Sequence, residues 1–206
     1  MSGAVMVLLL SFALSSCLVP QSVDPDTTRL PTVPVIDLTQ LPSHMLIPMI
    51  PLYKQSQADV DQGCVCHLQL VIPVVKEDDP TVDVEARWFL DYDLGNPASH
   101  ANVSRQDFQG SFTNPAVTRG PVTFDLDADS RGLAPGPHVV EVMIAETAAF
   151  AADTEQPPFR ALKINPPFDA TTFKIVVDVK NSASATTPCD RNTPIRIPPL
   201  QRVCTQ

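Results

Sequence analysis

Proline is the residue type that most constrains what this chain can fold into. It accounts for 22 of the 206 residues, about twice its usual share, whereas glycine accounts for only seven. A proline inside a helix removes a backbone hydrogen bond and clashes with the preceding turn. The sequence therefore predicts extended segments and strands rather than a helical bundle.

Charge and hydrophobic content narrow the class of protein further. Charged residues make up 18% of the chain, apolar residues 44%, and the formal net charge is −9. These values exclude collagen, a coiled coil and a highly charged disordered chain. An acidic chain also lacks the basic surface that binds phosphate backbones, so we expect no nucleic-acid partner.

The first residues indicate the compartment. Residues 4–14 are an apolar run, too short for the roughly 20 residues of a membrane-spanning helix and typical of a secretory signal peptide. The Leu14-Ser15-Ser16-Cys17 tetrapeptide that ends the run resembles the bacterial lipobox, although no Lys or Arg precedes the run. The resemblance implies a signal peptide over 1–16, a mature chain that begins at a diacylglycerol-modified Cys17, and a membrane anchor. Because Leu18 rather than Asp follows Cys17, the resemblance favours the outer membrane.

Two other interpretations of this N-terminal run remain open. It is also compatible with a buried hydrophobic strand, or with a cleaved signal peptide followed by a structural Cys17. The lipid-anchor interpretation differs from both because it predicts stable attachment to a bilayer. Each buried methylene of an acyl chain contributes about 0.8 kcal/mol, so several acyl chains together hold a protein stably in the membrane.

The segment after Cys17 is predicted to be a tether. Seven of the prolines fall within residues 18–52, a spacing that favours an extended, semi-rigid chain. We therefore expect a lipidated tether over 17–44. Residues 45–52 (MLIPMIPL) are too apolar for a free linker, and we expect an edge strand, where proline is tolerated. An exposed docking segment for a partner is the alternative.

Five later runs predict strands: 66–75, 82–92, 121–126, 137–145 and 171–179. In the second run Val82, Val84, Ala86 and Trp88 alternate with the polar Asp83, Glu85 and Arg87, a pattern typical of a strand with one buried face. Only residues 147–153 have helical character. Strands without intervening amphipathic helices predict an all-β fold, a single antiparallel sandwich of about seven strands over 45–180.

The order of these features resembles an immunoglobulin-like or fibronectin-type domain. Trp88 falls on the third strand, where such domains bury a tryptophan, and residues 133–140 (LAPGPHVV) resemble the corner that leads into their sixth strand. His138 stands where a corner tyrosine is usual, so the standard tyrosine corner is not expected. A carbohydrate-binding-like sandwich would give a similar pattern.

Four further cysteines, Cys64, Cys66, Cys189 and Cys204, predict two disulfides in an exported chain. Cys64 and Cys66 on one strand would point the same way, too far apart to pair with each other. We expect each to pair with Cys189 or Cys204, so that the tail over 181–206 packs back on the domain. If the two lie in an irregular segment, Cys189 pairs with Cys204. A zinc or copper site that adds His67 is disfavoured by the spacing.

Motifs that carry chemistry are scarce. Asp125, Asp127 and Asp129 suggest calcium, but an EF-hand needs glycine and glutamate where Ser130 and Gly136 stand. A different calcium site, with Asp91 or Asp93 added, is the alternative to a solvent-facing strand that runs into a turn. The histidines, His44, His67, His100 and His138, are scattered, and a triad formed in space is a minor alternative. We expect no enzyme and no cofactor.

The aromatic residues add little evidence for a ligand. Trp88, Tyr53 and Tyr92 are the aromatics available for sugar stacking, although Trp88 is expected in the core. Phe108 and Phe112 are expected to cap the sandwich rather than to face a ligand. The sequence thus predicts a lipid-anchored cell-envelope protein that acts as a structural or protein-interaction module with an envelope protein as partner. A glycan- or calcium-binding sandwich is the alternative, and a hydrolase is less favoured.

Overall fold

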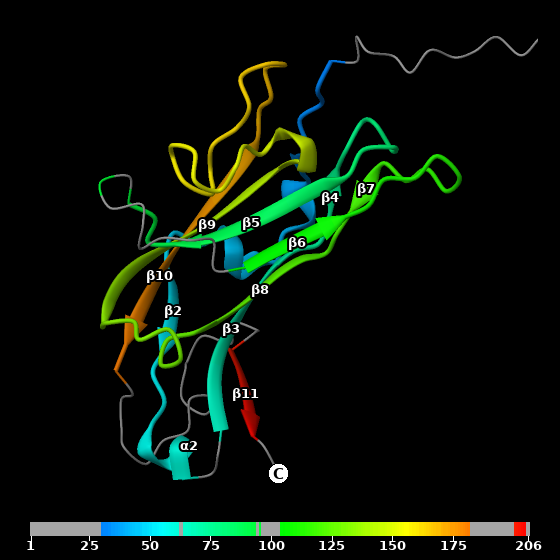
Figure 1. Cartoon of the computed structure of the whole chain (residues 1–206). Helices are drawn as coiled ribbons and strands as arrows, with labels where there is room; N and C mark the ends of the chain where they lie inside the picture. The colour runs from blue at the N-terminus through cyan, green and yellow to red at the C-terminus, as the bar shows by residue number, and fades with distance from the viewer. Residues whose placement is uncertain (1–29, 62–63, 94, 96–103, 182–199, 205–206) are drawn as a thin grey trace, which may run out of the picture. The chain divides into compact units, whose positions relative to one another are not determined.

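The computed structural model describes residues 30–61, 64–93, 95, 104–181 and 200–204, most of them in β-strands (Figure 1). The chain divides into two compact units, Met1–Leu30 and Pro31–Gln206. Among the described residues of the second unit the helical segments are short: η1 (Leu38–Gln40), η2 (Ser43–Leu46), α2 (Gln57–Asp61) and η4 (Thr147–Ala149). The prediction of an all-β fold is confirmed.

One sheet has five strands. Their order is β2 (Ile50–Tyr53), β10 (Thr171–Lys180), β9 (Gly136–Glu146), β5 (Val84–Leu90) and β6 (Ser104–Phe108). The edge strand β2 runs parallel to β10, and the other neighbours are antiparallel. Pro51 and Pro137 are the second residues of β2 and β9, whereas β5 and β10 contain no proline, so the prolines of this sheet lie near strand ends rather than in strand interiors.

Two three-stranded sheets complete the fold. One has the order β11 (Leu200–Cys204), β3 (Cys64–Ile72), β8 (Val122–Asp127), and the other has β1 (Val35–Ile36), β4 (Val75–Lys76), β7 (Thr118–Arg119). The chain passes from β3 of one sheet to β4 of the other at Pro73, and it returns from β7 to β8 at Gly120. A Cβ on Gly120, whose φ is +117°, would lie 2.8 Å from the Pro73 carbonyl oxygen, so this close approach requires glycine.

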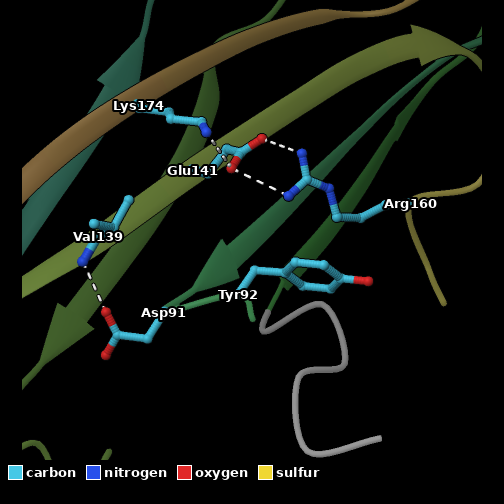
Figure 2. A pocket seen from close by; sticks show the side chains of 6 residues that line it. All are labelled: Asp91, Tyr92, Val139, Glu141, Arg160 and Lys174. Carbon is cyan, nitrogen blue, oxygen red and sulfur yellow. Dashed lines mark hydrogen bonds and ion pairs between the residues drawn. The ribbon is translucent and has the colours of Figure 1, made fainter. Parts of the chain in front are cut away.

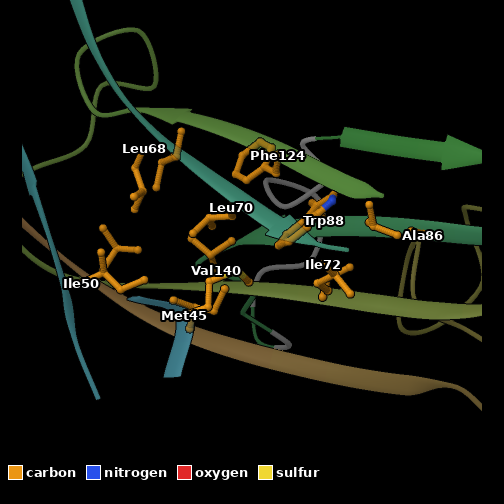
Figure 3. Close-up of a cluster of buried hydrophobic side chains, with 14 of the residues drawn as sticks. Met45, Ile50, Leu68, Leu70, Ile72, Ala86, Trp88, Phe124 and Val140 are labelled. Atoms are coloured by element: carbon orange, nitrogen blue, oxygen red, sulfur yellow. The ribbon is translucent and has the colours of Figure 1, made fainter. Parts of the chain in front are cut away.

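The main hydrophobic core lies between the five-stranded sheet and the other two (Figure 3). Alternate residues of the facing strands fill it, as the period of two in a strand requires. Trp88 is 0% exposed and stacks on Phe124 with ring centroids 5.5 Å apart. The predicted core position of Trp88 is therefore confirmed.

A side chain joins the edges of two sheets. Gln106 of β6 accepts a hydrogen bond from the Thr123 backbone N–H of β8 at 2.8 Å, and its amide nitrogen donates to the Thr123 hydroxyl at 3.2 Å. The oxygen and the nitrogen of the Gln106 side-chain amide thus both hydrogen-bond to Thr123. This pair of bonds links strands that belong to opposite layers.

The compact unit begins earlier than the expected boundary at residue 45. Ile36 and Leu41 belong to the main core, β1 pairs with β4, and the Thr171 hydroxyl donates to the Pro34 carbonyl. The strand expected over 45–52 starts only at Ile50, because Met45 and Leu46 complete a 3-10 turn. The expected signal peptide and Cys17 lie outside the described residues. No helix within the described ranges is long and apolar enough to span a membrane.

Candidate functional site

The outer face of the five-stranded sheet is covered by the chain itself. Residues 147–170, which connect β9 to β10 and are here called the covering segment, pack on Phe89, Met143 and Ala145. The covering segment contributes Ala149 and Phe150, with Phe159, Leu162 and Phe168 partly buried beside them. This second apolar cluster lies on the opposite side of the sheet from the main core.

Buried ion pairs hold the covering segment to β5. The Arg87 guanidinium pairs with Glu85 and donates to the Phe159 carbonyl at 2.6 Å and to Asp153 at 3.0 Å. It also lies 3.9 Å above the Phe150 ring, a favourable cation–π contact. Glu85, which is 0% exposed, takes a second ion pair from Arg105 at 2.7 Å. The sequence pattern placed Glu85 and Arg87 on a solvent-facing side, and this expectation is wrong because the covering segment buries them.

A recess of about 420 Å³ opens where the covering segment meets the sheet (Figure 2). Its lining residues come from the end of β5, from β9, from β10 and from the covering segment: Asp91, Tyr92, Val139, Glu141, Arg160 and Lys174. Glu141 is central, because it pairs with Arg160 and, at 3.5 Å, with the Lys174 ammonium. Lys174 remains 64% exposed and is the accessible cation of the lining.

Tyr92 gives the recess an aromatic wall. The Arg160 guanidinium lies 4.7 Å from the Tyr92 ring centroid and 5.3 Å from that of Phe89. The Tyr92 hydroxyl donates to the Pro158 carbonyl at 2.8 Å, so it also fixes the covering segment. Burial raises the pKa of Tyr92, with Glu141 acting in the same direction and Arg160 opposing it. The ring therefore stays neutral at physiological pH.

Asp91 and His138 form a bonded pair at the rim. Asp91 accepts from the Val139 backbone N–H at 2.8 Å and lies 2.5 Å from Nδ1 of His138, whose Nε2 lies 2.7 Å from the Ala134 carbonyl. Burial disfavours the charged ring, but the bonds to Asp91 and Ala134 outweigh it and raise the pKa of His138. Both ring nitrogens face acceptors, so the protonated ring donates two bonds.

The carboxylates of the recess are each paired with basic groups. Glu141 pairs with Arg160 and Lys174, and Asp91 pairs with His138. These ion pairs hold the lining of the recess in one geometry. The Tyr92 ring, the Val139 side chain and the Lys174 ammonium group all line it. Its chemistry suits binding through polar and apolar contacts.

The aspartates considered for calcium serve other purposes in the structure. Asp125 is exposed on β8, and Asp127 accepts bonds from the backbone N–H groups of Asp129 and Ser130 in the following turn. Asp129 accepts from the Gln55 N–H at 2.6 Å. Among the residues that the structure describes, no three His, Cys, Asp or Glu side chains gather in a way that could hold a metal ion.

The cysteines are described only in part. Cys66 is buried and disulfide-bonded, and the register of β3 with β11 sets Cys64 opposite Cys204. Cys17 and Cys189 lie outside the described residues. The predicted cross-pairing of Cys64 and Cys66 with Cys189 and Cys204 therefore stays a prediction.

The two phenylalanines expected to cap the sandwich differ in position. Phe108 packs against the main core, whereas Phe112 is 86% exposed, so the expectation for Phe112 is wrong. Of the histidines, His44 is buried in η2, His138 lies at the rim of the recess, and His100 lies outside the described residues.

Sequence reasoning missed Glu141, Arg160 and Lys174. Of these three residues, Glu141 could have been detected from the sequence, because it is a single carboxylate that interrupts the apolar run of β9 on the outward side of the strand. A charge at such a position signals a partner on a neighbouring element. Comparison of the chain with protein-family models, with curated proteins and with solved structures found no match.

Proposed function

We propose that this protein is a lipid-anchored lipoprotein of the bacterial cell envelope, on the outer membrane, whose β unit is a protein-interaction module. The anchor rests on the apolar run and the Leu14-Ser15-Ser16-Cys17 motif. Because the compact unit begins at Pro31, residues 18–30 separate it from Cys17. Thirteen fully extended residues span at most about 45 Å. The module would thus act close to its membrane.

We further propose that the β unit has an immunoglobulin-like arrangement. In that arrangement the second strand neighbours the fifth, and the third, sixth and seventh strands share the other sheet. The pairs β3 with β8 and β5 with β9 and β10 agree with this order if β2 is counted as the first strand and β6 as an added edge strand. The buried Trp88 on β5 is a further point of agreement.

One observation carries the interaction role: the recess beside an uncovered part of the sheet. Val139 is 40% exposed, and its register neighbour on β10, Val176, is half-buried on the same outward face. Val139 lines the recess together with Lys174 and Tyr92 (Figure 2). Val176 extends this mixed apolar and polar surface onto β10. Protein interfaces combine an aromatic and aliphatic centre with a polar rim in the same way.

The anchor is tested in cells with the full chain. Globomycin is expected to leave the precursor uncleaved, because it blocks the cleavage that follows acylation. Cys17→Ser is expected to leave the precursor uncleaved and also to prevent incorporation of labelled palmitate, because it removes the acceptor thiol. Normal processing in the presence of globomycin, or palmitate incorporation into the Cys17→Ser protein, would contradict the anchor.

The interaction surface is tested by cross-linking in intact envelopes. Lys174→Glu combined with Val139→Asp reverses charge and removes apolar area at the recess, and we expect the cross-linked partner to be lost. Asp125→Lys, an exposed charge reversal on the other layer, is the matched control and should keep it. Equal cross-linking of both variants would overturn this role for the recess.

The Tyr92 ring favours a glycan as a second candidate ligand. Sugars stack on aromatic rings and hydrogen-bond to carboxylate and ammonium groups, and here Asp91 and Lys174 flank the ring. Titration calorimetry with cell-wall oligosaccharides should then detect binding that Tyr92→Ala abolishes and Tyr92→Phe retains. Equal binding by wild type and Tyr92→Ala would exclude this recess as the glycan site.

A further inference from the structure

Three connections leave the five-stranded sheet at one end, and the chain enters the β unit at the same end. The register sets Val84 of β5 opposite Phe108 of β6 and Glu146 of β9. The turn before β5, the loop after β6 and the covering segment therefore all begin or finish there (Figure 1). The Glu146 carboxylate also accepts from the Thr32 backbone N–H at 2.5 Å, which places the start of the β unit beside them. This end of the β unit is here called the entry end.

Large apolar side chains are exposed on two loops of the entry end. Phe112, in the loop 109–117 between β6 and β7, is 86% exposed, and Ile164 of the covering segment is 88% exposed. These are the highest exposed fractions of large apolar residues in the described part of the β unit. Val33 and Val117, at the same end, are exposed as well. Apolar surface thus gathers around the point where the chain enters the fold.

Hydrogen bonds hold both loops in place. The Ser111 backbone N–H donates to the Pro80 carbonyl at 2.9 Å, and the Ser111 hydroxyl accepts from the Asn114 N–H at 3.0 Å. In the covering segment the Lys163 N–H donates to the Ala149 carbonyl at 2.8 Å, just beyond the end of β9. The apolar tips therefore stand on ordered turns. Exposed apolar groups gathered at one place on a surface mark a site of contact with a partner or a membrane.

We propose that the entry end rests on the bilayer and that the Phe112 and Ile164 side chains insert among the lipid headgroups. This inference rests on the proposed anchor at Cys17. The chain between Cys17 and the β unit spans at most about 45 Å and joins the unit at the entry end, so an anchored protein is held by that end. Apolar side chains that enter the headgroup region leave water, which favours this orientation over others.

The charge of the entry end fits a lipid surface without net charge. Lys163, next to Ile164, is exposed, but so are the carboxylates Asp78 and Asp169. Charges of both signs give little attraction to anionic headgroups, so the contact depends on the apolar tips. We therefore expect zwitterionic lipids to be sufficient.

This orientation leaves the recess open to a partner. Asp91 follows the last residue of β5, and Val139 lies near the start of β9, so the recess is displaced toward the end of the sheet opposite the entry end. With the entry end on the bilayer, the recess lies away from the lipid. The membrane contact and the proposed interaction surface are thus compatible.

The test compares tryptophan reporters at the two ends of the β unit. The lipidated full chain is reconstituted into phosphatidylcholine vesicles that contain a brominated lipid, which quenches tryptophan on contact. Phe112→Trp and Ile164→Trp add a reporter at the entry end. Ala134→Trp, in the exposed turn between β8 and β9 at the other end, is the matched control. Trp88 is buried and gives the same background in all three proteins. We expect quenching of the added emission to be at least about threefold stronger at the two entry-end positions than at the control.

Flotation of the same vesicles separates this inference from the proposed anchor. Protein that floats with the vesicles, but whose entry-end reporters are quenched no more than the control, would overturn the membrane contact and leave the anchor standing. Protein that does not float would overturn the anchor and the contact with it. A dimer in detergent solution that light scattering detects and Phe112→Ser disrupts would assign the apolar tips to a second copy of the chain, and it would also overturn the proposal.

Discussion

At the scale of single residues, His138 and His44 respond to pH in opposite directions because their surroundings differ. His138 faces the Asp91 carboxylate and the Ala134 carbonyl, which stabilise its charged form. His44 is buried in η2 with its Nε2 atom unpartnered, and burial lowers its pKa, although a bond to the Gln69 backbone opposes the shift. Each side chain makes its own contribution to the pH dependence of unfolding.

For His138 the stabilisation should be present at low pH and lost as pH rises. Its pKa is raised above 6.5, so the folded protein holds the proton more tightly than the unfolded chain. The contribution is complete below pH 6.5 and disappears as pH passes the folded-state pKa. Urea unfolding of wild type and His138→Gln at a series of pH values measures it. The difference between their free energies of unfolding should become smaller as pH rises. A difference that grows with pH would contradict the raised pKa of His138.

For His44 the sign is reversed. Its pKa is lowered below 6.5, so the unfolded chain binds the proton first as pH falls, and the folded state loses stability below pH 6.5. His44→Leu removes this titration, and its stability should decline less than that of the wild type between about pH 6.5 and pH 5. Parallel curves for the two proteins would rule out His44 as a source of acid sensitivity.

At the scale of elements, Arg87 connects β5 to the covering segment. Arg87→Met leaves Glu85 buried without one of its cations, a loss of about 3 kcal/mol in the free energy of unfolding. It also releases Phe159 and Asp153, so trypsin should cut faster after Arg160 and Lys163. Arg105→Met is the control, because Arg105 is 43% exposed and its loss should cost less than about 1 kcal/mol. Similar costs for both variants would argue against a buried network.

The strands were predictable because strand alternation is a local property. Val84, Ala86 and Trp88 point to the core as their spacing indicated, and the other four strand-forming runs each overlap a strand of the structure. Burial of Glu85 and Arg87 was not predictable, because Asp153, which pairs with Arg87, lies 66 residues later. No periodicity within β5 contains that information.

Neither the start of the β unit nor the recess could be predicted from the sequence, and the reason is the same for both. Prolines at 31, 34 and 42 are as compatible with a packed, irregular segment as with a free tether, and the choice depends on distant partners of Thr32 and Pro34. Arg160 stands among turn residues, and only the fold brings it to Glu141. Residues of the recess belong to four separate parts of the sequence.

At the scale of the whole molecule, Trp88 reports on folding. It is the only tryptophan and is fully buried, so native fluorescence should be blue-shifted and protected from acrylamide, with a red shift on unfolding. Trp88→Ala should cost about 3–5 kcal/mol. Phe112→Ala, which removes an exposed ring, should change stability by less than about 0.5 kcal/mol. A native spectrum like that of free tryptophan would refute this core.

The bonds between Gln106 and Thr123 have a consequence for behaviour at high concentration. Both residues lie on edge strands, β6 and β8, and an edge strand with unused backbone groups invites pairing with another molecule. Here the Thr123 N–H already donates a hydrogen bond to the Gln106 side chain of the same molecule. The edge of β8 is thereby closed to strand addition at that residue, and we expect this to disfavour edge-to-edge pairing between crowded copies of the protein.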